Sequence, residues 1–275
     1  MMRFDRVTPH IGALVSGADL TRPLSEQEVA EFEQALATHG VLFFRDQNLT
    51  PAQQRDFAAA FGPLHGHPAY ATVDGIPEVT ILESTAERPT LIEQWHSDMT
   101  FREEPPLGTL LLARVVPETG GDTQWASMTA AFAALSDTMQ SFLSSLTAIH
   151  DFSYGFKESL AAPGGRERLA DAVAAHPPVS HPVVVRHPVS GDRGLYVNSL
   201  FTTHIEGMKP RESRALLDFL FSHVREPEFV CRFRWTPGAI AFWDNRHTQH
   251  KPVNDYFPAH RLMHRITIHG SRPSA

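Results

Sequence analysis

The chain has 275 residues, of which 42% are hydrophobic and 20% charged, and its formal net charge is −7. This length suits one domain with a substantial core, so we expect residues 1–275 to form a single domain. The negative charge disfavours a nucleic-acid surface, and no apolar stretch is long enough for a membrane span. One cysteine and no visible signal peptide predict a cytoplasmic protein without a membrane partner.

The first part of the chain predicts two helices separated by a strand. Ser25 and Glu28 form a capping-box pattern, and the helix that they begin is expected to end near Gly40. The apolar run 41–44 predicts a buried strand. Thr50, followed by proline, predicts the start of a second helix.

Short strands dominate the rest of the chain. The expected strands are 78–82, 95–101, 108–116, 182–186, 194–198, 228–235, 239–243 and 264–269. Helices are expected at 128–149 and 211–224, and 157–178 is typical of an inserted helix-and-loop segment that can act as a lid. The pattern predicts a mainly β protein with α decorations, built on a double-stranded β-helix (jelly roll) core.

One tripeptide, His96-Ser97-Asp98, offers two metal-ligand side chains at alternate positions. If this segment is a strand, His96 and Asp98 point to the same face and reach the same ion. A chain with 16 histidines contains such a pair by chance, and a solvated strand face is its commoner meaning. A metal also needs a third ligand, which spacing alone does not identify. The candidates are His65, His67, His247 and His250.

Further residues at matching distances along the chain strengthen the case that His96 and Asp98 bind a metal. Thr123, His250 and Arg261 follow His96-Ser97-Asp98 at spacings that resemble the taurine/2-oxoglutarate dioxygenase family of non-haem iron enzymes. The resemblance extends over nearly the whole chain and includes Trp243-Asp-Asn-Arg246. It implies a jelly-roll enzyme that requires Fe(II), 2-oxoglutarate and O₂. By analogy with relatives, we expect a homodimer or homotetramer.

The resemblance also implies roles for individual residues. His96, Asp98 and His250 would hold the iron, and two imidazoles with one carboxylate suit the facial arrangement of Fe(II) oxygenases. Arg261 and the Thr123 hydroxyl would bind the far carboxylate of 2-oxoglutarate. Arginine suits this role because its planar fork pairs with both carboxylate oxygens.

The same resemblance predicts a substrate site for a small anion. Arg265 would bind a sulfonate group and His67 would assist it, although His65 is a rival in the same loop. The other expected substrate contacts are Tyr70, Phe156 and Phe201. The two phenylalanines are equally compatible with ordinary core positions. Taurine is the first substrate expected, hydroxylated beside its sulfonate so that sulfite is released.

One position departs from the taurine-oxidising members of the family. Ile92 stands where they carry an asparagine, so an amide is replaced by an apolar side chain. A site that lacks a hydrogen-bonding group discriminates less against apolar analogues. Ile92 therefore keeps three other substrate classes open, namely a larger alkanesulfonate, an alkyl sulfate ester and a phenoxyalkanoate.

Two other classes of function use the same residues. Zn²⁺ held by the same ligands would activate water for ester hydrolysis, but Thr123 and Arg261 would then have no cofactor to hold. A jelly-roll binding protein with an inactive site is the third possibility. The complete set of ligand residues argues against it.

Overall fold

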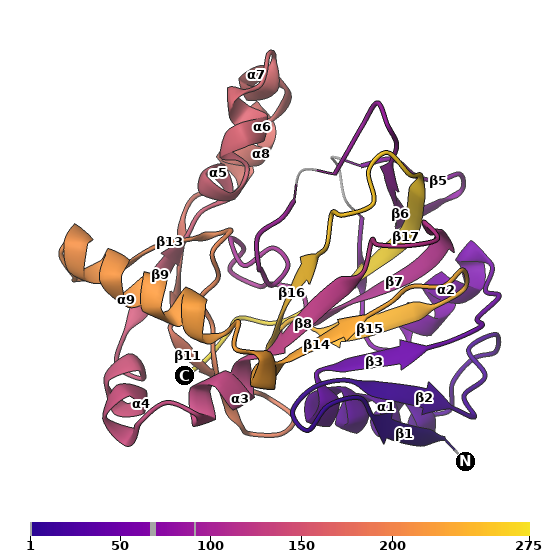
Figure 1. Ribbon diagram of the computed structural model, residues 1–275, viewed down its shortest axis with the longest axis horizontal. Coiled ribbons are helices and arrows are strands. Elements are labelled where there is room, and N and C mark those ends of the chain that lie inside the picture. The colour runs from indigo at the N-terminus through magenta and orange to yellow at the C-terminus, as the bar shows by residue number, and fades with distance from the viewer. Residues whose placement is uncertain (1, 67–69, 91) are drawn as a thin grey trace.

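The centre of the protein is a large mixed sheet. A computed structural model describes residues 2–66, 70–90 and 92–275. Within these residues the sheet has nine strands in the order β1-β2-β3-β15-β7-β17-β6-β5, with β4 paired to β17 (Figure 1). Its strands are β1 (Arg3–Arg6), β2 (Ala13–Ser16), β3 (Val41–Phe44), β4 (Leu64–His65), β5 (Thr72–Val73), β6 (Ile76–Ser84), β7 (Gly108–Val115), β15 (Ile240–Asp244) and β17 (Arg261–Ile268).

A smaller sheet packs on one face of the large one. It has the order β14-β8-β16 and consists of β8 (Thr123–Ser127), β14 (Val230–Phe233) and β16 (Thr248–Pro252). Between the two sheets lies an apolar core that includes Phe43 from β3, Trp125 from β8 and Phe233 from β14. The two packed sheets form the layered core of a jelly roll.

Helices α1 (Glu26–His39) and α2 (Pro51–Ala59) cover the opposite face of the large sheet. Strand residues alternate between the two cores: Phe43 faces the small sheet, while Phe44 packs with Phe32 of α1 and Phe57 of α2. Burial on both faces explains why these strands are continuously apolar. The predicted capping box at Ser25 and the predicted helix start at Thr50 are confirmed, because each hydroxyl accepts from the backbone N–H three residues later.

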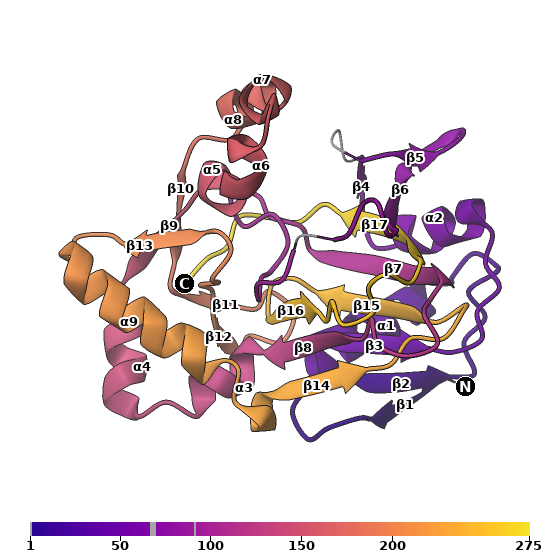
Figure 2. The ribbon, with the colours of Figure 1, turned by 45° about the horizontal axis from the view of Figure 1, so that its top comes forward.

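The remaining elements form a second lobe beside the sandwich (Figures 1 and 2). Strands β9 (Thr147–His150), β10 (Val179–Pro182) and β13 (Thr202–Ile205) form one small sheet, and β11 (Val184–Arg186) pairs with β12 (Arg193–Leu195). The other elements are α3 (Met128–Ala133), α4 (Asp137–Leu143), α5 (Phe152–Gly155), α6 (Lys157–Ala161), α7 (Gly165–Arg168), α8 (Ala170–Ala175), α9 (Pro210–His223) and a 3₁₀ turn, η1 (Pro227–Phe229). Among the described residues, no helix has the length and apolar character needed to cross a bilayer.

The structure confirms the inserted helices and corrects one predicted helix. Helices α6, α7 and α8 occupy the segment expected at 157–178 and project together from one end (Figure 2). That this segment acts as a lid stays a prediction. The single helix expected at 128–149 is wrong, because Ser136 accepts from the N–H of Met139 and caps a new helix. The end of that segment forms β9, which pairs with β10 and β13.

We predict that Phe43→Ala lowers the free energy of unfolding by about 3–5 kcal/mol, the usual cost of emptying a buried phenylalanine site. Phe43 is fully buried, stacks on Phe233 with ring centroids 4.2 Å apart and meets Trp125 edge-on. Urea unfolding followed by circular dichroism measures the change. The control is Phe219→Ala, because this side chain is 44% exposed on α9. A loss below about 1 kcal/mol for Phe43→Ala would contradict this account of the core.

Candidate active site

A pair of backbone hydrogen bonds brings two histidines together. The N–H of His96 donates to the carbonyl of His250 at 3.0 Å, and the N–H of His250 donates to the carbonyl of His96 at 2.7 Å. These bonds place His96 opposite β16, which carries His250 in the small sheet. Ser97 strengthens the junction by donating to the carbonyl of Thr248 at 2.6 Å. As a result, the centroids of the two imidazole rings lie 4.2 Å apart.

The expected strand over 95–101 is wrong. His96 and Asp98 nevertheless reach the same point, as the expected strand would have placed them. Only His96 pairs, and a turn begins at Asp98 in which Met99 has a φ of +47°. A positive φ is unusual for a residue other than glycine, and it redirects the chain directly after the carboxylate. The turn is held through Thr100, whose hydroxyl contacts His150 Nδ1 at 2.9 Å and Asn198 Nδ2 at 3.0 Å.

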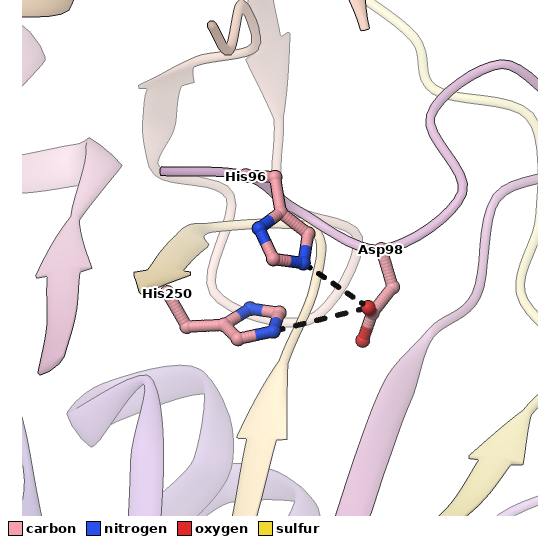
Figure 3. Close-up of side chains that lie close together, drawn as sticks. All are labelled: His96, Asp98 and His250. Atoms are coloured by element: carbon pink, nitrogen blue, oxygen red, sulfur yellow. Dashed lines mark ion pairs between the residues drawn. The ribbon is translucent and has the colours of Figure 1, made fainter. Parts of the chain in front are cut away.

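The side chains of His96, Asp98 and His250 converge on one point (Figure 3). Asp98 Oδ1 lies 3.8 Å from Nε2 of His96 and 3.8 Å from Nε2 of His250. These distances are too long for hydrogen bonds. All three side chains are buried, and one ligand atom from each lies within 4.8 Å of the others. Two nitrogens and one carboxylate oxygen around one point fit a divalent transition-metal ion.

The protonation states of the cluster also suit a metal. Burial lowers the pKa of His96 and lowers that of His250 to about 3, so both imidazoles are neutral near pH 7. The Nδ1–H of His96 donates to the carbonyl of Gln94 at 2.9 Å, which leaves Nε2 as an acceptor toward the cluster. Burial raises the pKa of Asp98, but His250, Arg265 and His96 lower it, and the result is about 2. The cluster therefore carries one negative charge.

Arg261 and Thr123 lie together on one side of the cluster. They line a cavity of about 350 Å³ that also contains Asp98 and His250. Arg261 is half-buried, and its buried Nε has no hydrogen-bond partner within the described residues. Thr123 Oγ1 already accepts from the indole of Trp235 at 3.0 Å, so its own hydrogen can be donated into the cavity. The two predicted anion-binding side chains thus face the same space as the metal cluster.

Arg265 lies closer to the metal cluster than Arg261 does. The two arginines share one face of β17, and four residues along a strand separate them by about 13 Å. Arg265 lines the cavity that contains Arg261 and also a second cavity of about 320 Å³. Its guanidinium lies 5.4 Å from the ring centroid of Tyr70 and lowers the pKa of Asp98. Its Nε is buried without a partner in the described part of the chain.

The second cavity is mainly apolar. Ile92, Phe156 and Phe201 all line it, as does Tyr70. Ile92 and Phe156 pack against an apolar cluster that contains Phe201, so these phenylalanines are both core and cavity residues. His67 lies outside the described residues. Its rival His65 lies in a different cleft, where it accepts from Arg102 at 3.2 Å.

The candidate site also contains residues that the sequence did not single out. Leu200 and Met99 extend the apolar lining, and Trp235 orients Thr123. Thr109 donates to Asp98, and Asn245 contacts both Thr109 and Asp98. Asn245 belongs to the Trp-Asp-Asn-Arg segment that resembles the family. That resemblance was the only indication in the sequence that Asn245 belongs to the site. His247, another possible third ligand, instead contacts Thr129 at 2.9 Å.

A jelly roll that brings two histidines and one carboxylate to a buried point is of the facial-triad class of non-haem iron proteins. Comparison with known proteins agrees. The taurine catabolism dioxygenase TauD, TfdA family matches residues 3–267, and the chain belongs to this family. It is an Fe(II)- and 2-oxoglutarate-dependent dioxygenase, which sets aside the hydrolase and the inactive binding protein considered above.

Individual relatives are similar over almost their full length. An alkylsulfatase from Acinetobacter baylyi is 35% identical over 273 residues, covering 98% of this chain and 85% of the relative. An alpha-ketoglutarate-dependent sulfate ester dioxygenase from Pseudomonas putida is 34% identical, covering 97% and 89%. The crystal structure of a taurine dioxygenase from Burkholderia xenovorans is 37% identical with a TM-score of 0.85, covering 100% and 91%. The expected jelly-roll fold is thereby confirmed.

We predict that Asp98→Ala abolishes tight Mn(II) binding, because it removes the only carboxylate of the described three-residue metal cluster. Isothermal titration calorimetry measures the affinity, and circular dichroism checks that the fold is kept. The control is Asp218→Ala, an exposed carboxylate on α9. Binding of Mn(II) to Asp98→Ala with the affinity of the wild type would contradict the assignment.

Proposed function

We propose that this dioxygenase oxidises the carbon that carries the sulfate group of an alkyl sulfate ester, in preference to taurine. The observation that carries the proposal is the composition of the cavity between the metal cluster and α6. Arg265 is a half-buried cation of this cavity, and the apolar side chains around it include Ile92 and Phe201. The other charged residues of the lining outside the metal cluster are exposed, namely Glu83, Arg88, Lys157 and Glu158. An anionic head with an apolar chain matches this distribution of charge.

The metal and 2-oxoglutarate would occupy the side of the cluster that contains Arg261. His96, Asp98 and His250 would hold Fe(II), and two neutral imidazoles with one carboxylate leave the ion a net charge of +1. Arg261 and the free hydrogen of Thr123 would then bind the far carboxylate of 2-oxoglutarate. The buried Nε of Arg261 supports this role, because a buried donor without an acceptor is costly.

Arg265 would bind the sulfate group of the substrate. Its position beside Asp98 holds the head group near the metal, so the carbon attached to the ester oxygen becomes the atom nearest the ion. Tyr70 flanks the guanidinium, so its ring would lie beside the same head group. His67 remains an expected contributor from the sequence.

Ile92 gives the site its preference. Its side chain packs with the cluster formed by Phe101, Phe152 and Phe201, and it offers no hydrogen bond to an ammonium group. Burying the ammonium of taurine beside Ile92 would place the charge against a side chain that offers it no hydrogen bond, which is costly. Burying methylene groups in the same place is favourable by about 0.8 kcal/mol each. Two relatives named for sulfate esters are consistent with this preference.

The reaction balances without any further reactant. The alkyl sulfate, O₂ and 2-oxoglutarate give the ester hydroxylated at its first carbon, succinate and CO₂. That carbon then loses its bond to the sulfate oxygen, giving an aldehyde and hydrogen sulfate. Iron with its bound co-substrates supplies the oxidant. The residues of the chain bind both anions, orient the carbon and exclude water through the apolar wall at Phe156 and Phe201.

A substrate panel tests the proposed function. Purified protein with Fe(II), ascorbate and 2-oxoglutarate receives octyl sulfate, octanesulfonate, taurine or phenoxyacetate, and succinate, sulfate and sulfite are measured. We expect the highest kcat/KM with octyl sulfate, with one sulfate released per succinate. A higher kcat/KM with taurine or phenoxyacetate would contradict the proposed preference.

We predict that replacing either arginine of β17 raises the KM of a different substrate. Arg261→Ala should raise the KM for 2-oxoglutarate about tenfold or more, because a charge-assisted hydrogen bond contributes about 1.5–3 kcal/mol. Arg265→Ala should instead raise the KM for octyl sulfate by a similar factor. Steady-state kinetics with each substrate varied in turn measures both. Arg214→Ala, an exposed arginine on α9, is the control. Exchanged phenotypes would contradict the division of roles.

We predict that Ile92→Asn shifts the ratio of kcat/KM for taurine over octyl sulfate at least tenfold toward taurine. The amide supplies a hydrogen-bonding group and removes apolar surface, both of which favour the polar substrate. Competition between the two substrates in one assay measures the ratio. Ile92→Leu keeps the apolar character and should leave the ratio unchanged. An unaltered ratio in Ile92→Asn would show that this position does not set the preference.

A further inference from the structure

The two oxygens of the Asp98 carboxylate have different partners. Oδ1 faces Nε2 of His96 and Nε2 of His250, as Figure 3 shows. Oδ2 accepts a hydrogen bond from the hydroxyl of Thr109 at 2.7 Å. Thr109 is the second residue of β7, so the large sheet fixes its position. Only one oxygen of Asp98 therefore points into the metal cluster.

Asn245, which directly follows β15, determines the direction of the hydrogen bond from Thr109. Its Oδ1 accepts from the backbone N–H of Asp98 at 3.2 Å and from the indole Nε1–H of Trp243 at 3.0 Å. Both of these groups can only donate, so the amide of Asn245 has one allowed orientation. Its Nδ2 then donates to Thr109 Oγ1 at 3.0 Å. Because Thr109 accepts from Asn245, its single hydrogen goes to Asp98.

Burial makes this arrangement persistent. The exposed fraction is 0% for Thr109, 1% for Asn245 and 2% for Trp243. Because these three side chains are buried, water does not replace the bonds between them, and breaking one hydrogen bond leaves a buried polar group without its partner. The backbone N–H of Asn245 is also fixed, since it donates to the carbonyl of Leu107 at 2.9 Å.

We propose that Thr109, oriented by Asn245, is a positioning residue that keeps Asp98 a ligand through one oxygen. This inference rests on the proposed metal site at His96, Asp98 and His250. Two imidazoles and one carboxylate oxygen leave three positions of an octahedral ion open, as 2-oxoglutarate and O₂ together require. A carboxylate whose two oxygens are both free can bind a cation with both. The second oxygen of Asp98 would then occupy a position that 2-oxoglutarate needs.

The test separates binding of the ion from binding of 2-oxoglutarate. Wild type, Thr109→Val, Thr109→Ser and Thr267→Val are titrated first with Mn(II) and then, loaded with Mn(II), with 2-oxoglutarate in a calorimeter. Thr109→Val keeps the shape of the side chain but lacks the hydroxyl, and Thr109→Ser restores it. Thr267 is a matched control, because it is buried and lies directly opposite Thr109 on β17.

We expect Thr109→Val to bind Mn(II) within threefold of the wild type but 2-oxoglutarate at least tenfold more weakly. Thr109→Ser and Thr267→Val should match the wild type in both titrations. A crystal structure of Mn(II)-loaded Thr109→Val should show both oxygens of Asp98 at the ion. If Thr109→Val does not fold, Thr109→Ala removes the same hydroxyl and replaces it in every measurement.

Two results would overturn the proposal. One is unchanged affinity for 2-oxoglutarate in the variant without the hydroxyl, and the other is a crystal structure of that variant in which Asp98 still binds through one oxygen. Failure of the wild type itself to bind Mn(II) would instead remove the metal site on which the proposal rests. The two failures are therefore distinguishable.

Discussion

The reciprocal backbone hydrogen bonds between His96 and His250 are the constraint on which the site depends. They join a segment from the first half of the chain to β16 in the small sheet, so the two imidazoles are set by the sheet and not by side-chain contacts alone. The turn at Met99 then returns the chain so that Asp98 meets both rings. Metal ligands placed by backbone geometry lose little entropy when an ion binds, which favours a preorganised site.

The second organising feature is the distribution of charge along β17. Arg261 and Arg265 point to the same face, and both have a buried Nε without a hydrogen-bond partner among the described residues. In the proposed function these arginines give the enzyme two anion sites, and Arg265 lies nearer the metal cluster than Arg261 does. A dicarboxylate and a sulfated substrate can then approach the ion from different directions. In the same proposal, the apolar wall at Ile92 and Phe156 would add selectivity for the rest of the substrate.

The sequence predicted those parts of the fold that local chemistry specifies. The capping box at Ser25, the helix start at Thr50, the apolar strands and the spacing of the family motif each depend on nearby residues or on a fixed pattern. The turn at Met99 was not predictable, because a positive φ there is maintained by long-range contacts of Thr100 with His150 and Asn198. The helix expected at 128–149 failed for a similar reason, since pairing with distant strands overrides local helix propensity in β9.

The supporting residues of the site were equally hidden. Thr109 is an ordinary strand threonine in the sequence, and only the fold brings it to Asp98. Asn245 stood within a recognisable segment, but its contacts reach across the core to residues more than a hundred positions away. Sequence spacing predicted the ligand residues because their distances along the chain resemble the motif of the family. It could not identify the hydrogen-bonded side chains that orient those ligands.

The most direct test of this account is an anaerobic crystal structure with Fe(II), 2-oxoglutarate and octyl sulfate. We predict iron held by His96, Asp98 and His250, with the far carboxylate of 2-oxoglutarate on Arg261 and the sulfate group on Arg265. The alkyl chain should lie against Ile92. Iron bound at other residues, or 2-oxoglutarate with its far carboxylate on Arg265, would contradict the central claim that Arg261 and Arg265 serve different anions at one metal cluster.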